Sequence, residues 1–288
     1  MRNIYKSFSL VIILISVFSS CSKKGCTDPM SLAYDVEAKK DDGSCTYPEV
    51  SKKSLVLRKT GDWCHYCGEY ATQWVNDIEN TYSNTVKVID LHSNDGFAVD
   101  VGYNMLNVLG SMSTPGFAVG SEVQPLNYSQ ITQAINSDIL LAPDVNVDLN
   151  FSIQDGKMNI NIHSLLSPGI SGDNYYLAAY ILEDGQVANQ KITGYVDPVT
   201  GTNVDPNFTH NNILRTEGSG SGNPFGNLLE FDVDGNNITS LSDIILAPST
   251  IWNHDNLYVV AVIWQQDGSG YRLSLIHISE PTRRYAIS

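Results

Sequence analysis

The chain has 288 residues, of which 42% are hydrophobic and 9% aromatic, and it carries a formal net charge of −14 at pH 7. This length is enough for two ordinary domains, and the apolar content excludes an intrinsically disordered chain. The acidic balance argues against nucleic acid as a partner, because phosphate binding requires clustered Lys and Arg.

The first twenty residues predict a lipoprotein signal peptide. A basic start with Arg2 and Lys6 precedes an apolar run over residues 8–18, which is too short to cross a bilayer as a helix. Small residues then precede Cys21, as in a lipobox, so we expect a lipid anchor on this cysteine. An ordinary signal peptide followed by a free cysteine is the alternative. The lipobox interpretation predicts a location in the cell envelope, at the outer membrane, facing the periplasm or the cell surface.

Residues 21–51 predict a tether that contains a small disulfide-bonded motif. The sequences GCTDP at 25–29 and DDGSC at 41–45 resemble a short repeat of secreted bacterial surface proteins. The segment is too short to bury a core, and a disulfide across it would contribute ~3 kcal/mol in the loop-entropy model. With Cys21 lipidated and two further cysteines in a redox pair, Cys26 and Cys45 remain to bond each other.

The sequence WCHYC at residues 63–67 lies between a short β-rich run and a segment with helical periodicity. At a helix start, free backbone N–H groups stabilise the thiolate of the first cysteine, and the second is close enough to resolve a mixed disulfide. We therefore predict Cys64 as the exposed attacking thiol and Cys67 as the resolving thiol. A zinc site is the alternative, but it needs four ligands, and the chain has no second Cys-x-x-Cys. We expect no metal and no other cofactor.

Trp63 before the cysteine pair and Thr114-Pro115 before a short apolar run resemble the thioredoxin superfamily. The resemblance implies an α/β thioredoxin-like domain over residues 52–141, with a cis-proline loop that faces the disulfide. It also implies that Trp63, Thr114 and Pro115 contact the substrate. The dipeptide His65-Tyr66 differs from the family's familiar ones, so the reduction potential stays open.

Elements of this predicted domain follow from hydrophobic periodicity. The expected elements are a helix with apolar residues Tyr70, Trp74, Ile78 and Tyr82, a buried parallel strand over 85–91, and helices over 97–108 and 129–141.

Residues 142–272 predict an all-β antiparallel sandwich. Apolar and polar residues alternate over 145–153, a turn follows at Asp155-Gly156, and the alternation resumes over 158–162. The runs 175–182 and 257–264 are apolar on both faces, which predicts central strands.

Two further features of this half bear on function. The sequence from His210 to Arg215, together with the run 175–184, resembles the twenty-eight-kilodalton outer-membrane lipoprotein family, which pairs a thioredoxin-like domain with a β-sandwich and includes adhesins. We favour a structural hydrogen bond for His210 over a catalytic role. Oxygen-bearing residues from Asp232 to Asp243 are spaced like a calcium loop, and a hairpin turn is the alternative.

The last residues, 273–288, read like a translated transposase adapter, and we predict that they are a non-native tail.

Two functions fit these observations. The first is a membrane-anchored thiol–disulfide oxidoreductase that acts on protein thiols or disulfides through Cys64 and Cys67, with a possible redox partner protein. The second is a binding or adhesion module in which the thioredoxin-like part is a scaffold. The intact Cys-x-x-Cys favours the first. Whether it would oxidise, reduce or isomerise does not follow from the sequence.

Overall fold

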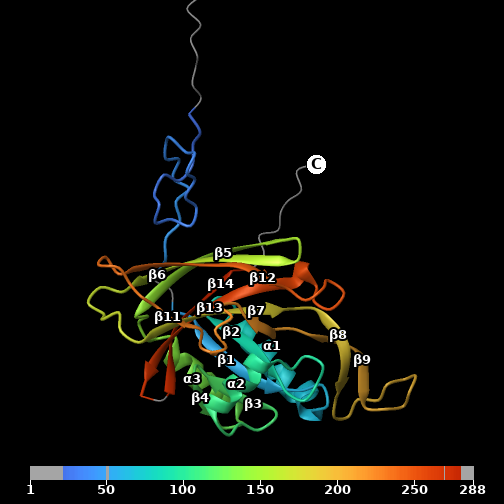
Figure 1. Cartoon of the computed structure of the whole chain (residues 1–288). Helices are drawn as coiled ribbons and strands as arrows, with labels where there is room; N and C mark the ends of the chain where they lie inside the picture. The colour runs from blue at the N-terminus through green and yellow to red at the C-terminus, as the bar shows by residue number, and fades with distance from the viewer. Residues whose placement is uncertain (1–21, 50–51, 269, 280–288) are drawn as a thin grey trace, which may run out of the picture.

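The structure, a computed structural model, describes residues 22–49, 52–268 and 270–279 (Figure 1). The predicted signal peptide and Cys21 lie outside the described residues. The helical elements are η1 (Cys67–Ala71), α1 (Thr72–Thr81), α2 (Asp100–Leu109), α3 (Tyr128–Asp138) and η2 (His254–Asn256). The strands are β1 (Ser54–Thr60), β2 (Val86–His92), β3 (Gly116–Val119), β4 (Glu122–Gln124), β5 (Val145–Gln154), β6 (Lys157–Leu166), β7 (Tyr175–Glu183), β8 (Gln186–Lys191), β9 (Val204–His210), β10 (Ile213–Glu217), β11 (Asn227–Leu228), β12 (Asn236–Ile245), β13 (Leu257–Asp267) and β14 (Gly270–Ser279).

The fold class predicted from the sequence is wrong. We expected an α/β domain followed by a separate antiparallel sandwich, but the described residues are mostly β and form one mixed nine-stranded sheet that draws strands from both stretches. Its order is β14-β13-β7-β10-β2-β1-β3-β4, with β11 paired to β7. Strand β2 pairs in parallel with β1 and β10, whereas the other pairs are antiparallel. Whether residues 52–141 and 142–272 can fold independently stays a prediction.

The junction between the two stretches is a short parallel contact of β2 with β10. The Asp90 N–H donates to the Asn212 carbonyl at 2.8 Å, and Ile213 lies opposite Asp90. Asn212 has a φ of 58°, a left-handed conformation that Asn tolerates better than most residues. Its side chain donates to Glu79 Oε1 at 2.9 Å and accepts from the Tyr258 hydroxyl at 3.0 Å. Sequence periodicity does not reveal which strand edge meets which, and this is why the shared sheet was missed.

Buried apolar side chains continue across this junction. One core contains Leu57 of β1, Leu91 of β2 and Met105 of α2 together with Tyr180 of β7 and Trp264 of β13, all of them fully buried. A second core packs the three-stranded sheet β12-β6-β5 against β7 and β13, and a third packs α1 and α3 against β1 and β3. Figure 1 shows the three α-helices together at one end of the body and β5, β6 and β12 at the other.

Several local predictions are confirmed. Strands β7 and β13 are each paired on both edges within the large sheet, as their two-sided apolar pattern indicates. Asp155 and Gly156 have φ values of 53° and 73° and join β5 to β6, with Gln154 opposite Lys157. This is the left-handed turn that two-residue hairpins favour.

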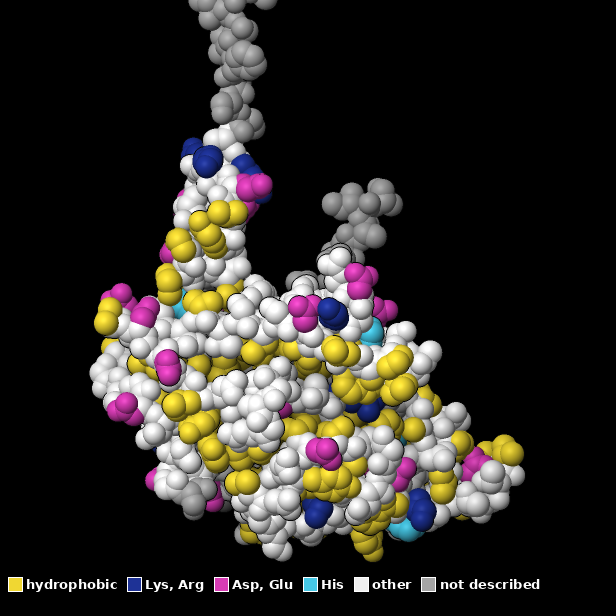
Figure 2. All heavy atoms as spheres, viewed as in Figure 1, with side chains coloured by type: hydrophobic (Ala, Val, Ile, Leu, Met, Phe, Trp, Pro, Cys, Tyr) yellow, Lys and Arg dark blue, Asp and Glu magenta, His cyan; other side chains and the backbone are white. Residues whose placement is uncertain are grey.

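Residues 22–49 form a small module that stands away from the body (Figure 1). Cys26 and Cys45 are disulfide-bonded to each other. The Asn150 side chain of β5 donates to the Leu32 carbonyl at 3.3 Å, which connects the module to the body. Figure 2 shows lysine side chains gathered at the outer end of this module. No helix among the described residues has both the length and the apolarity to cross a bilayer.

Strand β14 extends to Ser279, into the stretch that the sequence analysis assigned to a non-native tail. It pairs with β13 along its length, and Leu273 and Ile276 are buried in the core. The buried Lys52 also donates to the Ser274 carbonyl at 2.8 Å.

Deletion of residues 273–288 is therefore expected to lower the free energy of unfolding. Each buried aliphatic side chain contributes about 1.5–3 kcal/mol, so we expect a loss of at least ~3 kcal/mol by urea denaturation. Deletion of residues 280–288 alone serves as the control. Equal stability of the two truncated proteins would show that β14 adds nothing to the fold.

Candidate functional site

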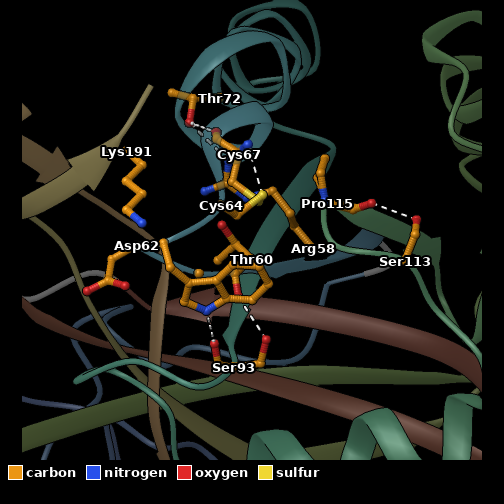
Figure 3. Close-up of a disulfide and its surroundings, with 12 residues drawn as sticks. Arg58, Thr60, Asp62, Cys64, Cys67, Thr72, Ser93, Ser113, Pro115 and Lys191 are labelled. Carbon is orange, nitrogen blue, oxygen red and sulfur yellow. Dashed lines mark hydrogen bonds between the residues drawn. A yellow bond between two sulfur atoms is a disulfide. The ribbon is translucent and has the colours of Figure 1, made fainter. Parts of the chain in front are cut away.

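Cys64 and Cys67 lie where β1 passes through a tight turn into the first helical turn, and they form a disulfide (Figure 3). Cys64 is 5% exposed and Cys67 is 1% exposed. The attacking cysteine predicted from the sequence is therefore buried in this oxidised state, although it remains the more accessible of the two. The sequence predicted an exposed Cys64 because the local turn does not reveal which distant residues cover it.

The backbone around the pair favours a negative charge on Cys64. The Cys67 N–H is shared between the Cys64 carbonyl oxygen at 3.1 Å and Cys64 Sγ at 3.2 Å, so a thiolate formed at this sulfur on reduction would accept a hydrogen bond. The first turn is a π-turn, η1, with a kink at Glu69, rather than the regular helix that the apolar spacing predicts. Thr72 Oγ1 donates to the Cys67 carbonyl at 2.7 Å and satisfies one carbonyl that the kink releases.

A buried ion pair lies next to the disulfide. Arg58 of β1 donates through Nε to Asp90 Oδ1 at 2.7 Å, and a second contact joins its Nη2 to Asp90 Oδ2. Its Nη1 also donates to Thr72 Oγ1 at 3.3 Å, so hydrogen bonds connect the ion pair to the Cys67 carbonyl. Both charged residues are buried, and the pairing offsets the cost of removing them from water.

Trp63 and Asp62 are held in place by the loop that follows β2. Trp63, 38% exposed, donates through Nε1 to the Ser93 carbonyl at 2.8 Å. Asp95 Oδ2 accepts from the Asp62 N–H at 3.0 Å and lies 2.6 Å from His92 Nδ1. Burial, and then the neighbouring Asp95 carboxylate, raise the pKa of Asp62.

The Thr114-Pro115 peptide bond is cis. Thr114 is half-buried and Pro115 is buried, and Ser113 Oγ donates to the Pro115 carbonyl at 2.7 Å. Figure 3 draws Pro115 on one side of the disulfide and Lys191 on the other. The structure thus brings Trp63, Pro115 and the cysteine pair together.

Aromatic side chains extend away from the disulfide along the helix. Tyr66, 55% exposed, lies 5.7 Å from Tyr70 between ring centroids, and Tyr70 lies 4.8 Å from Trp74. Tyr128 of α3 continues the series, with its ring 5.7 Å from Trp74. These partly exposed rings provide an apolar surface on which a substrate chain could pack.

The hairpin β8–β9 packs beside the cysteine loop, residues 61–68. The sequence did not predict this contact. Gln190 Nε2 lies 3.3, 3.2 and 3.0 Å from the carbonyl oxygens of Gly61, Asp62 and Cys64 and 3.0 Å from that of Lys191, and these acceptors share its two N–H hydrogens. The Lys191 N–H donates to the same Asp62 carbonyl at 2.7 Å. The hairpin also contains a β-bulge, because one residue of β8 lies opposite two residues of β9 between the pairs Ala188–Phe208 and Gln190–Asp205.

His210 makes the structural hydrogen bond that the sequence analysis favours. Its Nε2 lies 3.3 Å from the carbonyl oxygen of Asn189 on β8. Its ring packs on Phe97 and Phe208 at 4.9 and 4.8 Å and lies 5.7 Å from His92. Burial, with a further contribution from His92, lowers its pKa to about 4, so it is neutral near pH 7 and supports the hairpin without a charge.

Solved structures include chains with a similar fold. The chain is similar to HBP35 of Porphyromonas gingivalis, with a TM-score of 0.61 and 14% sequence identity, over 84% of this chain and 81% of that chain. At this identity the likeness shows the fold alone. No family model matches, and no curated protein matches. The neighbour and the Cys64–Cys67 pair are compatible with a thioredoxin-like redox or binding module. Membership of the twenty-eight-kilodalton family stays a prediction.

The residues that the sequence offered as zinc or calcium ligands bond to other groups of the protein. Within the described ranges, no group of three or more His, Cys, Asp or Glu is arranged to hold a metal ion. Cys64 and Cys67 are bonded to each other, which leaves no free thiolate for zinc. Asp232 Oδ1 accepts from the Asp234 and Asn236 N–H groups, whereas Asp243 pairs with Lys157 at 2.9 Å. The loop is a local turn, closed by the Asp232 N–H that donates to the Asn236 carbonyl at 2.9 Å, and the strands on either side, β11 and β12, pair with β7 and β6.

Stability is expected to fall on acidification because of His210. The folded-state pKa of about 4 lies below the ordinary 6.5, so the unfolded chain binds more protons between these values and stability decreases as the pH falls through this window. Between pH 7 and pH 5 the loss is ~2 kcal/mol. In His210→Gln this part of the pH dependence of urea unfolding should disappear, whereas His254→Gln should retain it. An unchanged slope in His210→Gln would contradict the assignment.

Proposed function

We propose that the protein is a membrane-anchored thiol–disulfide oxidoreductase of the cell envelope that acts on protein thiols or disulfides. The observation that carries the proposal is the Cys67 N–H directed at Cys64 Sγ at 3.2 Å, in a disulfide at the start of a helical segment. This contact stabilises the thiolate of one cysteine only, so it gives the two thiols different roles. The exposed Trp63 and the cis-Pro115 loop flank the pair and would hold the substrate chain.

The exchange proceeds by two attacks at sulfur. In the reduced protein, the Cys64 thiolate attacks one sulfur of a substrate disulfide, forms a mixed disulfide and releases the other substrate sulfur as a thiolate, which takes up a proton. Cys67, after losing its proton, attacks Cys64 Sγ, forms the Cys64–Cys67 disulfide and releases the second substrate thiol. Two electrons pass from the cysteine pair to the substrate. The reverse sequence oxidises a substrate dithiol, and either direction needs a second thiol or disulfide partner to restore the pair.

The proposed attachment is a lipid on Cys21, followed by residues 22–49 as a spacer. The disulfide-bonded module stands away from the body, and its lysines gather at the end that leads to Cys21 (Figure 2). An outer-membrane location, facing the periplasm or the cell surface, is part of the proposal.

A binding or adhesion module is the second candidate. The burial of Cys64 at 5% exposed favours it, because a buried disulfide can act as a structural crosslink. The two functions differ in whether the pair exchanges with other thiols.

Cys67→Ser is expected to trap mixed disulfides with substrate proteins, because the resolving thiol is gone. Cys64→Ser should trap few, since Cys67 lacks the directed N–H and is the more deeply buried of the two. The measurement is non-reducing electrophoresis of cell-envelope extracts. In reduced wild type, alkylation near pH 6 should label Cys64 before Cys67, because a lowered thiol pKa raises its thiolate fraction. Equal labelling, with no trapped partner in either variant, would favour the scaffold function.

Cys21→Ser is expected to move the protein from the membrane fraction to the soluble fraction, because the proposed lipid is its attachment. Cell fractionation with immunoblotting measures this, and Ser22→Ala is the matched control. If Cys21→Ser remains in the membrane fraction as firmly as wild type, the lipid-anchor proposal is wrong.

A further inference from the structure

The hairpin β8–β9 extends from the second half of the chain to the cysteine loop in the first half. Figure 1 shows it projecting from the large sheet beside the helical end of the body, and Figure 3 shows Lys191 next to the disulfide. The two strands pair from Gln186 with His210 to Lys191 with Val204. They form a separate two-stranded sheet, so packing against the cysteine loop is a distinct contact of this hairpin.

The contact is close and specific. Gln190 is 2% exposed, and its amide group faces the carbonyl oxygens of Gly61, Asp62 and Cys64. Gly68 allows the approach, because a Cβ at this position would lie 2.5 Å from the Lys191 carbonyl oxygen. The hairpin therefore touches both sides of the cysteine pair, before Cys64 and after Cys67.

Gln190 follows the regular alternation of β8, which places its side chain on the face that meets this loop, so Gln190 is buried whereas Asn189 is exposed. The register shift between Ala188 and Gln190 places the extra residue on β9, between Asp205 and Phe208. The hydrogen bond between His210 of β9 and the Asn189 carbonyl joins the two strands next to Gln190.

We propose that Gln190 is a positioning residue for the redox chemistry of Cys64. The inference rests on the disulfide exchange proposed above. The carbonyls of Gly61, Asp62 and Cys64 each also accept from a backbone N–H group, and the Gln190 amide is the side-chain group that joins all three to the hairpin. By holding the loop, Gln190 keeps Cys64 Sγ in line with the Cys67 N–H, which is the contact that stabilises the thiolate. Small displacements of such a contact cost large factors in reactivity.

The charges that face Cys64 are the same in all variants of the test. They are Asp62 in its own loop, His65 on the following turn, Lys191 on β8, the Arg58–Asp90 pair on β1 and β2, and Asp95 after β2. Gln190→Met and Gln190→Leu both remove the donors without adding a charge, the first at a length similar to that of Gln. Val187→Ala, at an exposed position of the same strand, is the matched control.

The experiment measures the pH profile of Cys64 alkylation in the reduced, detergent-solubilised full chain, with iodoacetamide and peptide mass mapping. In both Gln190 variants we expect alkylation at pH 6 to slow about tenfold, which corresponds to a rise of about one unit in the pKa of Cys64. The fraction of Cys64–Cys67 disulfide in glutathione buffers should shift as well. Val187→Ala should match wild type within twofold.

Profiles and glutathione equilibria within twofold of wild type in both variants, even with a lower Tm, would overturn the proposal, because Gln190 would then stabilise the fold without acting on the thiol. Failure of both variants to fold would overturn it too, since Gln190 would be a folding residue. The readout uses small molecules only. If the trapping experiment yields no protein partners, the proposed oxidoreductase function is wrong. If the pH profile of Cys64 alkylation is unchanged in the Gln190 variants, the proposed role of Gln190 is wrong.

Discussion

The contact of Asn212 with Asp90 joins the two halves of this protein. One backbone hydrogen bond of 2.8 Å places β10 beside β2, and the nine-stranded sheet continues through this contact. Asn212 meets the geometric demand because it adopts a φ of 58° while its side chain bonds to both Glu79 and Tyr258. Replacement by a β-branched residue would lose these bonds and strain the backbone. The cores on either side then become continuous, with Leu57 and Trp264 in the same cluster.

Joining the halves buries several charged groups, and the structure pairs them. Glu183 of β7 is fully buried and bonds to Arg215 of β10 at 2.6 Å. The guanidinium of Arg215 lies over the rings of Phe97 and Trp252, at 5.2 and 5.8 Å from their centroids. Because an unpaired buried charge costs several kcal/mol, these partners hold the relative position of the strands as well as neutralising the charge.

The same arrangement connects the second half to the cysteine pair. His210 lies at the end of β9, just before the junction, and it bonds to the carbonyl of Asn189, the residue before Gln190, whose side chain meets Gly61, Asp62 and Cys64. The strand pairing that joins the sheet thus also sets the position of the hairpin at the disulfide. A protein with only the first half would keep the Cys-x-x-Cys but lose this contact. The β-rich half is therefore part of the environment of the cysteine pair, in either of the two functions considered.

The sequence by itself determined the features that depend on neighbouring residues. It located the cysteine pair after a strand, the turn at Asp155-Gly156, and the central strands β7 and β13, because turn chemistry and hydrophobic alternation are local. Tertiary structure alone decided the shared sheet, the burial of Cys64 and the contact of Gln190 with Gly61, which lies 129 positions away in the chain. A strand's pattern states which face is buried but not which edge finds a partner, so one sequence without the fold leaves such pairings open.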